Sequence, residues 1–240
     1  MNSKLKINNS KLPFVFVNMA MTADGKIATA NRTVHSFGSR RDLEHLYELR
    51  ATADAVMCGA RTVEISHSVL GTGGERFRKQ RLKRGLSEYN LRVIVSGNGS
   101  VDPAAGIFKK RFSPVIVLTT KCAPAIKLAQ LRKLADEVKI CGNRKINFPA
   151  ALRWLRTKWN VKRLLCEGGG ELNDALFRAG LVDEINLTIC PKIFGGRTAP
   201  TMAEGIGFQR LAQAEEFRIK SIRRYEGELF TVFSKRNRRV

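Results

Sequence analysis

Residues 164–172, with the sequence LLCEGGGEL, join a short apolar run to three consecutive glycines and then to the start of a helical pattern. Glycine carries no side chain, so its backbone can approach a ligand closely. Its N–H groups, together with the N-terminus of the following helix, form a site for an anion such as a pyrophosphate. The spacing differs from the G-x-G-x-x-G fingerprint of the usual dinucleotide-binding fold, so that fold is not indicated. A tight turn without a ligand is the other interpretation of this run.

Polar residues stand at the ends of two apolar runs. Glu167 directly precedes the glycines, and ligands of open α/β sheets bind beside the C-terminal ends of strands. We expect its carboxylate to accept hydrogen bonds from substrate hydroxyl or ring N–H groups, with a helix-cap or ion-pair role as the alternative. A second run, 55–58, ends at Gly59 and is followed by Arg61 and Thr62. Thr62 suits a hydrogen bond to a cofactor phosphate or amide, and Arg61 suits the 2′-phosphate that distinguishes NADP from NAD.

Strand-like and helix-like runs alternate along the rest of the chain. We predict strands at 14–20, 55–58, 91–95, 115–118, 138–141, 163–166, 184–189 and, as a pair, within 217–234, and helices at 40–52, 124–135, 149–159 and 171–179. Ser39 is the predicted N-cap of the first helix, and Gly180 ends the last one. This order predicts one α/β domain over 13–235, with a mostly parallel central sheet flanked by helices and an antiparallel C-terminal hairpin at one edge. Residues 1–12 and 236–240 are expected to be tails, and 64–90 an irregular loop.

Composition limits the class of protein. The chain has 240 residues, 43% of them hydrophobic, and no apolar stretch of the roughly 20 residues that a membrane span needs. Its polar first residues lack the apolar core of a signal peptide, so we expect a cytoplasmic protein. Five cysteines without a C-x-x-C pair predict buried free thiols rather than a zinc site, so no metal is expected.

The formal net charge of +22 predicts a surface that attracts anions. Phosphorylated small molecules and nucleic acids both satisfy that charge. The basic residues are spread along the chain, without interleaved aromatics or a nucleic-acid-binding motif, so a nucleic-acid partner is not expected. A basic nucleic-acid-binding protein without enzymatic activity remains the alternative from a different functional class.

Several motifs together resemble one known family, the reductases of riboflavin biosynthesis. They occur in the family's order within about residues 13–208: 18–27 (NMAMTADGKI), Arg50-Ala51, Asp54-Ala55, Gly59, Thr62-Val63, Glu167-Gly168-Gly169 with Leu172, 181–184 (LVDE) and 191–196 (PKIFGG). The likeness is strongest to the stand-alone archaeal and fungal members. It implies a dihydrofolate-reductase-like fold, a homodimer, and NADPH-dependent reduction of the ribosyl group of a pyrimidine ribosylamine phosphate to ribityl. Bacterial relatives carry a zinc deaminase domain in front; because its H-x-E and P-C-x-x-C motifs are missing from this sequence, we expect no deaminase step.

The resemblance also implies site residues. The cofactor would contact Ser36, Thr62, Ser66, Ser96, Ile146, Gly168, Gly169, Gly170, Glu171 and Leu172, and the substrate would lie among Val34, Arg50, Leu70 and Glu167. We expect Arg50 to hold the substrate phosphate. Ser66 stands where the family has a cofactor-contacting Asp, and serine forms hydrogen bonds but offers no carboxylate. Reduction of a related heterocycle in another pathway is therefore a second interpretation, and no residue is assigned as proton donor.

Overall fold

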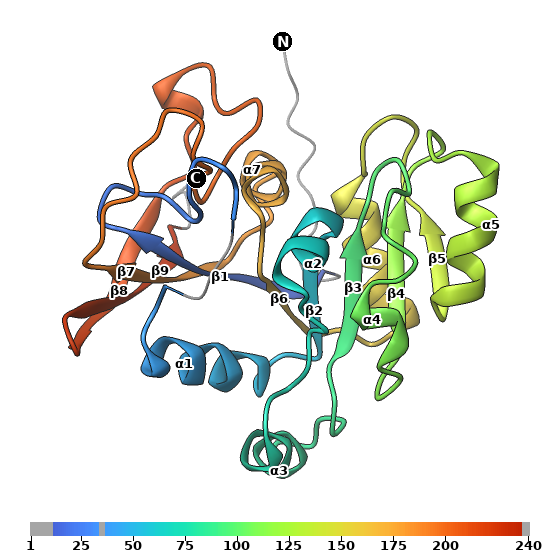
Figure 1. Cartoon of the computed structure of the whole chain (residues 1–240), viewed down its shortest axis with the longest axis horizontal. Coiled ribbons are helices and arrows are strands. Elements are labelled where there is room, and N and C mark those ends of the chain that lie inside the picture. Colours follow the sequence, from blue (N-terminus) through green and yellow to red (C-terminus); the bar gives the residue numbers. More distant parts are fainter. Residues whose placement is uncertain (1–11, 34–36, 237–240) are drawn as a thin grey trace.

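The computed structural model describes residues 12–33 and 37–236 of the chain. Nine strands form one sheet in the order β5-β4-β3-β2-β6-β1-β7-β9-β8 (Figure 1). Their bounds are β1 (Phe14–Thr22), β2 (Ala55–Gly59), β3 (Leu91–Val95), β4 (Val115–Thr119), β5 (Glu137–Ile140), β6 (Arg163–Cys166), β7 (Glu184–Cys190), β8 (Phe217–Tyr225) and β9 (Glu228–Lys235). Strands β1 to β7 pair in parallel, whereas β9 is antiparallel to both β7 and β8. The predicted parallel sheet with an antiparallel C-terminal hairpin at one edge is confirmed.

Helices cover both faces of the sheet because strand side chains alternate between the two faces. Val15 and Val17 of β1 join a core cluster with α6 and α7, whereas Phe16 between them joins the cluster that contains α2, α4 and α5. The helices are α1 (Arg40–Arg50), α2 (Ala60–Ser66), α3 (Glu75–Lys83), α4 (Gly106–Lys109), α5 (Ala125–Leu134), α6 (Phe148–Lys158) and α7 (Gly170–Arg178), with a 3-10 turn at Leu211–Gln213. None of the helices in the described ranges has the length and apolar character needed to cross a bilayer.

The predicted helix ends agree with the structure. The Asp42 N–H donates to the Ser39 hydroxyl at 3.2 Å, so Ser39 is the N-cap of α1. Gly180 follows α7 with a φ of +66°, the left-handed conformation that terminates helices without strain in glycine. Of the five cysteines, all but the exposed Cys122 are buried free thiols.

The prediction that 64–90 forms an irregular loop is wrong. This segment contains the end of α2 and all of α3. Helix α3 buries only Phe77 and Arg81, so its sequence shows little apolar periodicity. Arg81 is 1% exposed because its guanidinium donates to the carbonyl oxygens of Arg50, Ala53 and Ser87, and burial lowers its pKa to about 10. These polar contacts, which an apolar pattern cannot reveal, attach α3 to the end of α1.

Candidate active site

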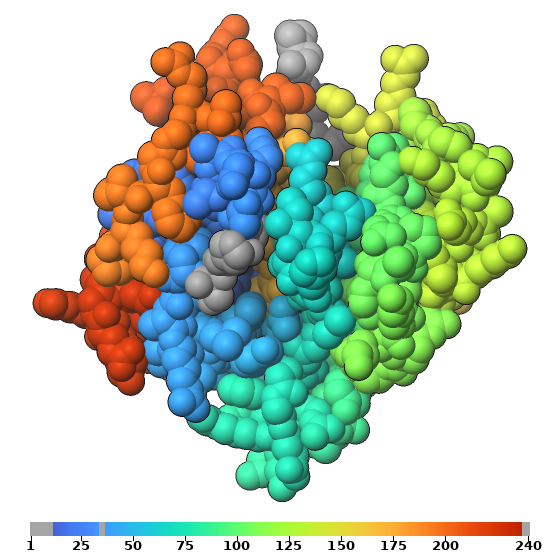
Figure 2. Space-filling view, viewed as in Figure 1, coloured from blue at the N-terminus to red at the C-terminus, as the bar shows by residue number. Residues whose placement is uncertain are grey.

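A cavity of about 1320 Å³ lies at the edge where the parallel strands end. The later part of β1 and the ends of β2, β3 and β6 contribute to its walls, together with α1, α2 and α7. Figure 2 shows the face on which α1, in blue, and α2, in cyan, border the cavity. Ligand pockets commonly measure about 300–1000 Å³. This cavity therefore has room for a dinucleotide and a second ligand beside it.

The glycine run forms one wall, where two strand-to-helix turns meet. The Gly59 N–H of the β2–α2 turn donates to the Gly168 carbonyl of the β6–α7 turn at 2.8 Å. A Cβ placed on Gly169 would contact only the Thr62 hydroxyl, at 3.5 Å, so bare backbone faces the cavity here. A Cβ on Gly170 would lie 2.6 Å from the Thr201 carbonyl oxygen, so close packing requires glycine at this position.

The start of α7 offers donors for an anion. The N–H groups of Leu172 and Asn173 donate to the Gly169 carbonyl at 3.0 and 3.1 Å. Within the described ranges, no backbone carbonyl accepts from the N–H groups of Gly170 and Glu171. Helix N-termini with free N–H groups favour negative charge. The wall therefore fits the pyrophosphate of a dinucleotide.

A buried ion pair forms another part of the cavity wall. Arg50, the last residue of α1, donates through Nε and Nη2 to the two carboxylate oxygens of Glu167 at 2.7 and 2.6 Å. Its Nη1 donates to the Gly71 carbonyl, and the whole residue is 5% exposed. Burial opposes the charged form of Arg50, but the Glu167 carboxylate more than compensates and raises the Arg50 pKa. Three of the five N–H donors of Arg50 are therefore used within the protein, and two remain. The guanidinium primarily binds Glu167, not a substrate phosphate as the sequence led us to expect.

Most of the predicted site residues line this one cavity: Arg50, Thr62, Ser66, Leu70, Ser96, Ile146, Glu167, Gly169, Gly170, Glu171 and Leu172. Val34 and Ser36 lie outside the described residues. Gly168 does not line the cavity. It packs against β1 instead, where an added Cβ would lie 2.9 Å from the Met19 sulfur.

Three of these residues also have local structural contacts. Ser66 stands where the family has an Asp. Its hydroxyl donates to the carbonyl oxygen of Thr62, one helical turn earlier, at 2.6 Å. The Ser96 hydroxyl donates to the Ser100 carbonyl at 3.1 Å, and Leu70 is buried in the core cluster that contains α2. Their contacts with ligands stay predictions.

Two cavity residues have no assignment from the sequence. Asn18 on β1 lines the cavity, and its Oδ1 is buried without a hydrogen-bond partner among the described residues. Asp42, in the first turn of α1, also lines the cavity. Burial raises the pKa of the Asp42 carboxyl; the neighbouring Thr188 hydroxyl opposes this rise, and the Glu228 carboxylate adds to it. Asn18 begins the 18–27 motif, although no role follows from that motif, and no pattern in the sequence marks Asp42.

The chain matches the family model described as RibD C-terminal domain over residues 13–230. It is 35% identical over 226 residues to the 2,5-diamino-6-ribosylamino-4(3H)-pyrimidinone 5′-phosphate reductase of Archaeoglobus fulgidus, covering 94% of this chain and 99% of that protein. A pyrimidine reductase-like protein from Corynebacterium diphtheriae has a similar structure, with a TM-score of 0.77, 19% identity, and coverage of 98% of this chain and 96% of that one.

The fold also resembles a larger protein from Thermotoga maritima, a diaminohydroxyphosphoribosylaminopyrimidine deaminase/5-amino-6-(5-phosphoribosylamino)uracil reductase. The TM-score is 0.71 at 19% identity. The match covers 95% of this chain but only 58% of that protein. At this identity the likeness shows the fold alone.

Proposed function

Because the chain belongs to the RibD C-terminal domain family, we propose that it reduces the ribosylamino group of a pyrimidinone ribosylamine 5′-phosphate to ribitylamino, with NADPH as the reductant. The observation that supports this most is the cavity itself. It contains both a bare-backbone, donor-rich wall at Gly169 and Gly170 and a region beside α1 and the Arg50–Glu167 pair. A dinucleotide and a substrate can therefore lie in contact.

The cofactor would extend along the ends of the strands. The N–H groups of Gly170 and Glu171, with Thr62, would hold its pyrophosphate, and Ser96 and Ile146 would contact its adenosine. NADPH rather than NADH is proposed because the exposed cations Arg61 and Lys145 also line the cavity, and such cations favour a 2′-phosphate. Bound there, the nicotinamide supplies a hydride.

The protein positions the sugar for that hydride. In its open-chain form the ribosylamine is an imine, and reduction adds a hydride to C1′ and a proton to the nitrogen, which leaves a ribitylamine. Each oxygen of Glu167 accepts one hydrogen bond from Arg50 and has a second lone pair for a substrate hydroxyl. Arg50 fixes the orientation of this carboxylate, and holding the reactants in contact supplies much of the rate. The proton comes from water in this proposal.

Turnover with defined substrates tests the proposal. The purified chain should oxidise NADPH when the pyrimidinone ribosylamine phosphate is added and not when dihydrofolate is added, and the product should contain a ribityl group. Glu167→Gln should lower kcat strongly and leave the Kd for NADPH unchanged, because Glu167 lies in the region beside α1 that the substrate would occupy. Glu44→Gln, which changes a carboxylate on the same helix as Arg50 but outside the cavity, is the matched control. Unchanged turnover in Glu167→Gln removes Glu167 from the site.

The proposal includes a homodimer in the cytoplasm. Strand β8 is the edge of the sheet, and its Ile219, Ile222 and Tyr225 are 59%, 56% and 48% exposed. Apolar side chains on an edge strand favour association with another chain. Light scattering after size-exclusion chromatography should give twice the chain mass of 26.8 kDa. A monomer at micromolar concentration contradicts this part of the proposal.

A further inference from the structure

Six carboxylates line the cavity, and most are already engaged by the protein. Glu167 is paired with Arg50, Asp174 with Arg178, and Glu204 lies 3.8 Å from Arg32. Glu64 accepts a hydrogen bond from the Asp102 N–H, and Glu171 is exposed at the start of α7. Asp42 is different, because it is half-buried, forms no ion pair with a described residue, and has the Thr188 hydroxyl as its one hydrogen-bonding side-chain neighbour.

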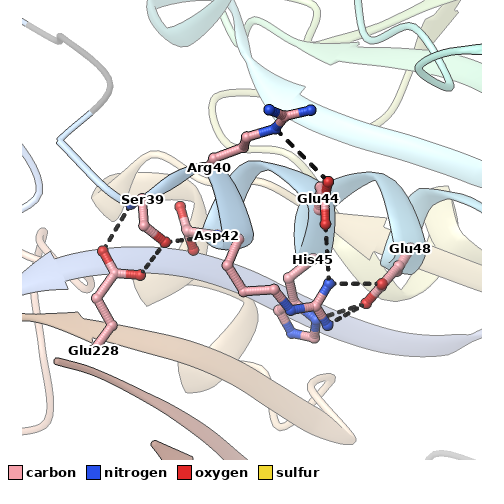
Figure 3. A network of polar contacts seen from close by, with 8 residues as sticks. Ser39, Arg40, Asp42, Glu44, His45, Glu48 and Glu228 are labelled. Carbon is pink, nitrogen blue, oxygen red and sulfur yellow. Dashed lines mark hydrogen bonds and ion pairs between the residues drawn. The ribbon is translucent and has the colours of Figure 1, made fainter. Parts of the chain in front are cut away.

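The usual structural role of such an aspartate is filled by another residue. Asp42 is the third residue of α1, and in a capping box the side chain at this position accepts a hydrogen bond from the N–H of the N-cap. Here Glu228 of β9 takes that place: it accepts from the Ser39 N–H at 2.7 Å and from the Ser39 hydroxyl at 2.6 Å (Figure 3). The Asp42 carboxylate is therefore not needed to cap its helix.

The surroundings of Asp42 satisfy its carboxylate only in part. The Thr188 hydroxyl lies beside Asp42 and favours its charged form, but a hydroxyl carries one proton and so engages at most one of the two carboxylate oxygens. A partly desolvated carboxylate with an unpartnered oxygen is well suited to accept hydrogen bonds from a ligand. Because Asp42 lines the cavity, a ligand bound there can supply the remaining donors.

We propose that Asp42 binds the N3–H and 2-amino edge of the pyrimidinone ring and so selects the 2-amino heterocycle over the corresponding uracil. This inference rests on the proposed function. The 2-amino group and N3–H of a 2-aminopyrimidin-4-one are two adjacent, roughly parallel N–H donors, and a carboxylate accepts two such donors in a bidentate way. Glu167 offers no equivalent bidentate face, because Arg50 already binds both of its oxygens side by side and leaves each with only its second lone pair.

A uracil presents a different edge. It has a carbonyl oxygen at C2, which would face the Asp42 carboxylate and repel it. A site built for a substrate N–H rejects an analogue that lacks it because the polar groups of the site lose their partner. Asn at position 42 would match the uracil, with its amide N–H directed at the C2 carbonyl and its amide oxygen at N3–H.

The experiment compares both substrates in three proteins: the wild type, Asp42→Asn and the control Glu44→Gln. With NADPH, the wild type should prefer the pyrimidinone ribosylamine phosphate. Asp42→Asn should lower kcat/KM for it by roughly 10- to 100-fold, the effect of losing hydrogen bonds to a charged group, and should raise kcat/KM for the uracil counterpart. Glu44→Gln should leave both values unchanged. Equal losses for both substrates in Asp42→Asn, or no loss, overturn the inference.

A binding measurement without turnover completes the test. Calorimetry with NADP⁺ present compares 2,5,6-triaminopyrimidin-4-one with 5,6-diaminouracil, which differ at C2. The wild type should bind the triamino compound more tightly, Asp42→Asn should reverse or abolish the difference, and both proteins should bind NADP⁺ equally. Equal affinity of the wild type for the two compounds overturns the inference alone. A wild type that reduces neither phosphorylated substrate refutes the proposed function and this inference with it.

Discussion

Removal of Arg50 tests whether the buried pair with Glu167 organises the site. Arg50→Met deletes two charge-assisted hydrogen bonds to Glu167 and one to the Gly71 carbonyl, and leaves a carboxylate whose side chain is 12% exposed without its partner. Removing one member of a buried pair costs about 3–5 kcal/mol. The double variant Arg50→Met/Glu167→Met replaces both charges with apolar groups, so it should be more stable than Arg50→Met alone.

Urea unfolding followed by tryptophan fluorescence measures the free energy of unfolding of each variant. Both tryptophans, Trp154 and Trp159, lie at α6, on the opposite face of the sheet from α1, so their signal reports unfolding and not the local substitution. Arg41→Met is the matched control. It also breaks a two-point contact, with Glu48, but the side chains are 29% and 33% exposed. It should cost about 1 kcal/mol or less. If Arg50→Met costs no more than Arg41→Met, or if the two single variants add up to the double variant, the pair does not have the stabilising role assigned to it here.

Three further predictions follow from the cavity and its surroundings. Gly169→Ala should fold normally, since its Cβ meets only Thr62, but should bind NADPH at least about 10-fold more weakly in a fluorescence titration. Gly170→Ala should instead lower the melting temperature measured by calorimetry, because its Cβ meets the Thr201 carbonyl oxygen; equal behaviour of the two variants contradicts the assigned wall. Burial raises the pKa of the Asp42 carboxyl; the Thr188 hydroxyl opposes this rise, the Glu228 carboxylate adds to it, and His45 opposes it. Measured against pH, kcat/KM for the pyrimidinone should therefore fall on acidification through a pKa above the ordinary value of an aspartate, and Asp42→Asn should lose this acid limb; an identical profile in the variant contradicts the role of Asp42. Four of the five cysteines are buried, and burial raises the pKa of Cys166 and Cys190 to about 12. A thiol reagent should therefore modify only the exposed Cys122 in the native chain and all five cysteines after denaturation; rapid modification of more than one native thiol contradicts the buried placement.

The sequence predicts the sheet well because apolar runs and glycine turns mark buried parallel strands. The shared cavity of most site residues was also predictable, since the C-terminal ends of neighbouring parallel strands meet at one edge of the sheet. Helix α3 was not predictable in the same way, because it is held by the polar contacts of Arg81 rather than by an apolar face.

Long-range partnerships account for what the sequence does not reveal. Arg50 and Glu167 are each marked by motifs as separate substrate contacts, but they lie 117 positions apart and only the fold shows that they bind each other. The same holds for Asp42. A local pattern identifies Ser39 as the cap of α1, but not that Glu228, 189 positions further on, occupies the Ser39 N–H and leaves Asp42 facing the cavity.

The central claim is that the chain reduces a pyrimidinone ribosylamine phosphate. The most direct test mixes the purified protein with limiting NADPH and that substrate, and follows NADPH oxidation together with the mass of the product. We predict one NADPH oxidised for each product molecule, which gains two hydrogen atoms. No oxidation and no binding of NADPH, together with strong salt-sensitive binding of RNA or DNA by this +22 chain, would contradict the claim and favour a nucleic-acid-binding protein instead.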